Sequence, residues 1–149
     1  MKFSAREDID APIESVFDAV SDFDAFERRM LRRGVDIVRD NAVPLDEVGA
    51  CWKAKVSWRG RVYDVNAELV ALEPGEGYTI ESRSNGIESS GVVELVALSK
   101  TRTRMFVSID LRPVTLSARL LVQSLRLAKG NLSRRFKTRV HEFAKGLTG

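Results

Sequence analysis

The sequence is poor in the residues that build most metal sites and nucleophilic sites. It contains one cysteine, Cys51, and one histidine, His141. A single cysteine excludes an internal disulfide and a cysteine-rich metal site, and a histidine zinc site or a Ser-His-Asp triad would have to use His141. We interpret Cys51 as structural and His141 as a surface residue on the polar side of a helix. Metal-ligand spacings, phosphate-binding loops and dinucleotide motifs are also missing from the sequence, which therefore predicts no metal and no cofactor.

Long apolar runs are missing too. No segment approaches the roughly 18 consecutive apolar residues of a membrane span. The N-terminal segment includes Arg6, Glu7 and Asp8, where a secretion signal would have an apolar core. We therefore expect a cytoplasmic protein. The composition, 44% hydrophobic and 30% charged, is typical of a globular chain, and the length predicts one domain over residues 1–149.

Charge is unevenly distributed along the chain. Residues 114–149 carry eight Lys or Arg and one acid, although the net charge of the whole chain is +3. A second basic cluster consists of Arg28, Arg29, Arg32 and Arg33. This cluster could make a peripheral contact with an anionic membrane or an acidic protein, or it could be a solvated helix face that pairs with Asp22, Asp24 and Glu27. Because aromatic platforms are not interleaved with the basic residues, we expect no nucleic acid partner.

The spacing of the apolar residues predicts an α+β domain. Residues 2–10 alternate as a strand, and residues 13–20 follow Pro12 at helical spacing. A second short helix is expected from about Asp24 to Arg32, with Gly34 as its C-terminal cap. Six strands joined by hairpin-length connections should follow between Val35 and Arg112, which favours an antiparallel sheet.

One face of this predicted sheet is apolar and the other is charged, with Val62, Val96 and Phe106 as exceptions on the charged face. After Pro113, apolar residues recur at steps of three and four and predict one long helix with a bend at Gly130. The stripe of this helix that should face the core is Leu121, Leu125, Ala128, Leu132, Phe136, Val140, Phe143 and Leu147. Leu116, Leu120 and Leu127 fall on the opposite side. They should be exposed unless a loop covers them, and they could form a homodimer contact or the lip of a cavity.

A motif near the N-terminus suggests a family. Between Ile9 and Asp22 the chain has the end of a strand, then Ala11-Pro12, then Ile13-Glu14-Ser15-Val16-Phe17, and an aspartate a few residues later. This segment resembles the opening of the helix-grip domains, which are called START-like, Bet v 1-like or polyketide cyclase-like. The resemblance implies a seven-stranded antiparallel sheet curved around a long C-terminal helix, with a cavity between the sheet and the helix.

The same resemblance implies that residues on the inner face of the sheet and on the helix line this cavity. The candidate ligand-binding residues are Trp52, Trp58, Tyr63, Tyr78, Val93, Met105, Val107, Ile109, Leu121, Leu125 and Leu132. Apolar walls with a few aromatic donors suit a small hydrophobic molecule, such as a lipid, a quinone-like or a polyketide-like compound. A packed interior without a usable void is the alternative.

We expect a protein that binds or transports such a ligand without covalent chemistry. One alternative is a polyketide cyclase or aromatase in which Tyr63, Tyr78 or Glu7 moves a proton, and another is a protein-interaction module. Glu7 lies on the apolar side of the first strand, where it would be an acid or base if buried; alternatively, a bulge turns it outward or it forms a salt bridge to an arginine. Two or more titratable groups at the cavity base would favour the enzyme, whereas an apolar base with a polar mouth would favour the carrier.

Overall fold

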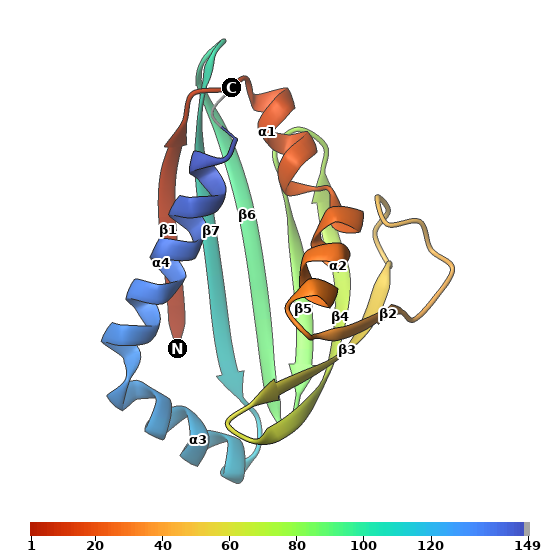
Figure 1. Ribbon diagram of the computed structural model, residues 1–149, viewed down its shortest axis with the longest axis vertical. Helices are drawn as coiled ribbons and strands as arrows, with labels where there is room; N and C mark the ends of the chain where they lie inside the picture. The colour runs from red at the N-terminus through yellow and green to blue at the C-terminus, as the bar shows by residue number, and fades with distance from the viewer. Residues whose placement is uncertain (148–149) are drawn as a thin grey trace.

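The computed structural model describes residues 1–147, which form seven strands and four helices (Figure 1). The strands are β1 (Lys2–Ile9), β2 (Asp36–Arg39), β3 (Cys51–Trp58), β4 (Arg61–Glu73), β5 (Gly77–Ser84), β6 (Ile87–Ser99) and β7 (Arg102–Pro113). The helices are α1 (Ile13–Val20), α2 (Phe23–Arg32), α3 (Leu116–Leu127) and α4 (Lys129–Lys145). The expected order of one strand, two short helices and six strands is confirmed.

The seven strands form one antiparallel sheet in the order β1-β7-β6-β5-β4-β3-β2. Only β1 lies out of chain order, because it pairs with β7, and every other strand pairs with its neighbour in the sequence. The alternation of side chains separates the two faces as predicted. Phe3 and Ile9 are buried on the inner face, whereas the apolar exceptions Val62, Val96 and Phe106 are exposed on the outer face.

Helix α2 begins and ends through local signals that the sequence contains. The Asp22 side chain accepts a hydrogen bond from the Ala25 N–H at 3.1 Å, which satisfies one of the amides left unpaired at a helix start. After Arg32, Gly34 adopts a φ of 84°, a left-handed conformation that costs glycine little. Figure 1 shows α1 and α2 on the same face of the sheet as α4.

The C-terminal region is two helices, not the single long helix that we expected. Helix α3 ends at Ala128, which has φ −103° and ψ 10°, and Gly130 lies inside α4. The Ala128 N–H donates to the Leu125 carbonyl oxygen at 3.0 Å, and this tight closure ends the first helix. Figure 1 shows α3 crossing one end of the sheet and α4 running back along β1. The change of direction therefore falls two residues before the predicted bend.

The core stripe predicted for this region is correct only in part. In α4, Val140 is buried as expected. In α3 the buried residues are Ala118 and Val122, whereas Leu121 and Leu125 are half-buried. Because α3 contacts the sheet mainly through β7 at one end, its buried side is narrow and suits small side chains.

The three leucines on the other side of α3 are exposed. The exposed fractions are 74% for Leu116, 59% for Leu120 and 92% for Leu127, so no loop within residues 1–147 buries them. The homodimer contact expected there stays a prediction. None of the helices within the described part of the chain combines the length and the apolar character that crossing a membrane requires.

Candidate ligand-binding site

The position of α4 determines where the molecule is hollow. Helix α4 packs mainly on β1, at the edge of the sheet. The rings of Phe3 and Phe136 lie 6.2 Å apart, and Glu7 Oε1 lies 2.7 Å from His141 Nδ1. Because α4 lies over this edge, it does not fill the middle of the inner face. The strands β5, β6 and β7 therefore form a floor between α4 on one side and α2 on the other.

A cavity of about 620 Å³ lies over this floor. Its base is formed by Tyr78, Val93, Met105 and Val107 from the three strands, together with Val20 at the end of α1. Both walls are also largely apolar. The wall residues from α2 and α4 are Phe26, Met30, Phe136, Val140 and Phe143. This concave, apolar space is of the size that small-molecule sites usually have.

A second cavity, of about 210 Å³, adjoins the first and shares with it Phe26, Met30 and Tyr78. It extends under α2 toward β3, where Trp52 lines it. The Trp52 indole Nε1–H donates to Glu27 Oε1 at 2.7 Å, so the polar atom of this side chain is satisfied by α2. The two cavities together give an elongated apolar site.

Tyr78 stands where the two cavities meet, but its hydroxyl is used by the fold. The hydroxyl donates to the Val20 carbonyl oxygen at 2.6 Å, which satisfies one of the carbonyls left unpaired at the end of α1. The Phe23 ring packs edge-on against the Tyr78 ring at 5.1 Å. Burial raises the pKa of the Tyr78 phenol above its ordinary value, so the group stays protonated at neutral pH.

The mouth of the larger cavity is charged, in contrast to its base. Arg29, Arg33, Arg139 and Glu142 line it, and all four are exposed. The guanidinium carbon of Arg29 lies 5.5 Å from the centroid of the Phe26 ring and 5.2 Å from that of the Phe143 ring. These two rings stack on each other at 6.1 Å, so aromatic side chains from α2 and α4 together hold Arg29.

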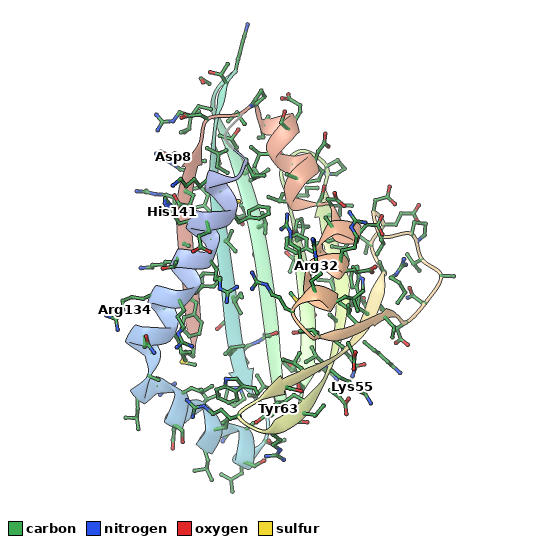
Figure 2. The ribbon with its side chains drawn as sticks, in the orientation of Figure 1. Asp8, Arg32, Lys55, Tyr63, Arg134 and His141 are labelled. Atoms are coloured by element: carbon green, nitrogen blue, oxygen red, sulfur yellow. The ribbon has the colours of Figure 1, made fainter. Side chains whose placement is uncertain are left out.

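The structure places five of the eleven candidate residues at these cavities. Tyr78, Val93, Met105 and Val107 line the larger one, and Trp52 and Tyr78 line the smaller one. Six candidates line neither cavity, namely Trp58, Tyr63, Ile109, Leu121, Leu125 and Leu132. The alternation of the strands was interpreted correctly, but the site occupies only part of the inner face. Figure 2 shows Tyr63 near the turn of the β3–β4 hairpin and away from His141.

Sequence reasoning missed the contribution of α2 and the charged residues of α4. Phe26 and Met30 form one pair four residues apart, and Arg29 and Arg33 form another. Residues spaced in this way share a helix face, so both pairs were visible in the sequence. The sequence does not show where α2 lies relative to the sheet. Without that position, the basic cluster is interpreted as a solvated helix face.

The residues considered for proton transfer do not converge. Glu7 pairs with His141 beside β1, and neither residue lines the two cavities. The Tyr63 ring packs 6.3 Å from the ring of Trp58, which is 38% exposed. Burial raises the pKa of the Cys51 thiol, which contacts the Gly49 carbonyl oxygen on another part of the sheet. Within residues 1–147, no three His, Cys, Asp or Glu side chains gather where they could hold a metal ion.

A larger hollow, of about 710 Å³, lies along β1, β6 and β7. Charged side chains from Lys2, Arg6, Glu94 and Lys137 line it. An apolar molecule bound there beside Val92 and Phe106 would displace water from these charged groups and from Glu7. The cavity between α2 and α4 is therefore the better candidate for a ligand site.

Comparison with solved structures establishes the architecture. An aromatase/cyclase from Streptomyces sp. R1128, Zhui, aligns over 99% of this chain and 93% of its own, with a TM-score of 0.66 and 11% identity. The chain has the helix-grip fold. The protein TTHA0849 from Thermus thermophilus aligns with a TM-score of 0.69 and 11% identity, over 99% of this chain and 97% of the other. A norcoclaurine synthase point mutant from Thalictrum, in complex with a transition-state analogue, aligns with a TM-score of 0.66 and 10% identity, over 99% and 93% of the two chains.

At the level of sequence, neither a protein-family model nor a curated relative matches the chain. The low identities mean that the likeness concerns the fold alone. The helix-grip fold implied by the N-terminal motif is thus confirmed.

Proposed function

We propose that this helix-grip domain binds a small hydrophobic ligand reversibly in the cavity between α2 and α4. The observation that carries the proposal is the contrast within one cavity between an apolar base, with Val93, Met105 and Val107, and a charged mouth. A ligand that buries about 200 Å² of apolar surface there would gain roughly 5 kcal/mol before the entropy of association is subtracted. Affinity in the micromolar range then requires a good fit or one well-made polar contact.

The cyclase or aromatase alternative has less support. A general acid or base must reach its substrate from a sheltered position. Tyr78 is the titratable residue at the cavity base, and its hydroxyl already donates to Val20. Tyr63 and Glu7 line neither cavity. The likeness to an aromatase/cyclase and to norcoclaurine synthase therefore concerns a shared scaffold, and the arrangement of side chains favours binding without turnover.

The proposal is tested by a substitution that places a larger side chain on the floor of the cavity. Val93 of β6 is half-buried and lines the cavity, whereas Val96 of the same strand is 49% exposed on the outer face. Val93→Phe should block ligand entry, and Val96→Phe is the matched control because it makes the same change on the same strand.

Small molecules that remain bound to the purified protein are first extracted from it and identified by mass spectrometry. Binding of fatty acids, isoprenoids, quinones and aromatic polyketides is then followed through the fluorescence of Trp52, which lines the adjoining cavity. The proposal predicts saturable binding by the wild type and by Val96→Phe, and loss of binding by Val93→Phe. Absence of binding across the panel, or equal binding by both variants, would overturn it.

A further inference from the structure

The mouth of the larger cavity carries more positive charge than its own acid can neutralise. Arg29 and Arg33 lie one turn apart at the end of α2, and Arg139 faces the same cavity from α4. Glu142 is the only acidic residue among the lining residues. Among the ion pairs within residues 1–147, none includes any of these three arginines.

Two of the acids that lie close to α2 in the sequence are used for other contacts. Asp22 caps the start of α2 through the Ala25 N–H, and Glu27 accepts the indole N–H of Trp52. The fold also places the four arginines of the basic cluster in two different environments. Arg29 and Arg33 line the cavity mouth, whereas Arg28 and Arg32 do not.

The packing of Arg29 leaves its hydrogen-bond donors available. Phe26 and Phe143 contact the guanidinium group within cation–π distance. The N–H donors of a guanidinium point outward in its plane, where they match the two oxygens of a carboxylate or phosphate. The rings thus fix the position of the cation without using its donors.

We propose that the ligand is an amphipathic acid, with its apolar body in the cavity and its carboxylate or phosphate group at the mouth between Arg29, Arg33 and Arg139. This inference rests on the proposed function, because the arginines select a head group only if an apolar body occupies the cavity. A neutral ligand would leave Glu142 as the one acid facing three cations, whereas an anionic head would make charge-assisted hydrogen bonds to the arginines.

The test compares decanoate with decanol, which share a chain length and differ in the charge of the head. Binding is followed through Trp52 fluorescence in a Trp58→Phe background and checked by calorimetry. The test variant is Arg29→Gln with Arg139→Gln. The control variant, Arg32→Gln with Arg134→Gln, removes the same charge from the same two helices at positions that do not line the cavity (Figure 2).

The test variant should bind decanoate about tenfold or more weakly, as expected for the loss of a charge-assisted hydrogen bond, and should bind decanol within about twofold of the wild type. The control variant should keep both affinities within about twofold. Glu142→Gln removes a negative charge from the mouth and should therefore increase the affinity for decanoate. Added salt should weaken decanoate binding to the wild type, because these exposed charges are screened.

Binding of decyl phosphate is measured in the same way, to distinguish a site for carboxylates from a site for any anionic head group. A loss for decanoate alone identifies a carboxylate, and a loss for both identifies an anionic head in general. Equal losses for decanoate and decanol, or equal losses in the test and control variants, would overturn the inference. If decanol and decanoate both bind but neither depends on the arginines, the inference fails and the proposed function stands. If neither decanoate nor decanol binds the wild type, the inference fails, and the proposed function is decided by the panel of fatty acids, isoprenoids, quinones and aromatic polyketides.

Discussion

The hydroxyl of Tyr78 allows a sharp test of how the floor of the cavity is built. Tyr78 is 8% exposed, and its hydroxyl donates to the Val20 carbonyl oxygen at 2.6 Å. Tyr78→Phe removes this donor and leaves a buried carbonyl without its partner, at a cost of about 1–3 kcal/mol. A domain of this size loses about 3 °C in Tm per kcal/mol, so the midpoint should fall by roughly 3–9 °C.

The measurements are thermal unfolding and urea unfolding, both followed by circular dichroism, with Tyr63→Phe as the matched control. Tyr63 is half-buried, and its hydroxyl has no hydrogen-bond partner among residues 1–147. Its replacement should change the free energy of unfolding by less than about 0.5 kcal/mol. Ligand affinity should change little in either variant, because the Tyr78 hydroxyl is directed at α1. A Tyr78→Phe protein with unchanged stability and weakened ligand binding would refute this reasoning.

The same side chain predicts a dependence on alkaline pH. Burial raises the pKa of the Tyr78 phenol above the ordinary value of about 10, so the unfolded chain releases this proton first as the pH rises. The stabilising contribution is fully present below pH of about 10 and is lost as the pH rises beyond it. Stability should therefore fall more steeply above that pH in the wild type than in Tyr78→Phe. Parallel pH profiles for the two proteins would contradict the burial of the phenol.

Three further predictions concern packing and assembly. Gly77→Ala should destabilise by about 1–3 kcal/mol or more, because the new Cβ would overlap the Val93 carbonyl oxygen, whereas Gly91→Ala meets only an ordinary contact and should be mild in the same unfolding assay. Leu69→Ala removes a fully buried side chain and should cost about 2–5 kcal/mol, while Leu132→Ala, at a half-buried position, should cost clearly less. A homodimer through the exposed leucines of α3 should sediment faster as concentration rises, and a constant monomer would exclude that contact.

The sheet could be predicted from the sequence because each strand is recognised from the pattern of its own residues. Alternation with a period of two assigns each side chain to a face, and it does so even for the exposed Val96 and Phe106. The hairpin connections then leave few choices for strand order. Helix α2 was predictable for the same reason, since its cap at Asp22 and its end at Gly34 lie within a few residues of the chain.

Features that depend on distant residues were not predictable in this way. Glu7 was expected to pair with an arginine or to act as a buried acid, but it pairs with His141, which is 134 positions away. The helix was expected to bend at Gly130 but breaks at Ala128, because the helix has to turn from the end of the sheet to its edge. Gly130, two residues after Ala128, is a poor helix former, but it lies inside α4 and is not the point where the helix breaks. The position of the sheet decides where the helix ends.

The same distinction explains why only part of the cavity lining was predicted. The floor residues Met105 and Val107 follow from strand alternation, but Arg29 and Arg139 reach the cavity only because α2 and α4 lie on opposite sides of the open floor. This arrangement places the apolar surface at the base of the cavity and the charged side chains at its mouth. The base is apolar, and its titratable hydroxyl, that of Tyr78, donates to Val20, whereas the charged groups are exposed at the mouth. The guanidinium groups at the mouth stay protonated at neutral pH and are therefore poor general acids and bases, but they can select ligands by the sign of their charge. Under the proposed function, the charged mouth of this helix-grip domain therefore selects among the ligands that its apolar base accepts.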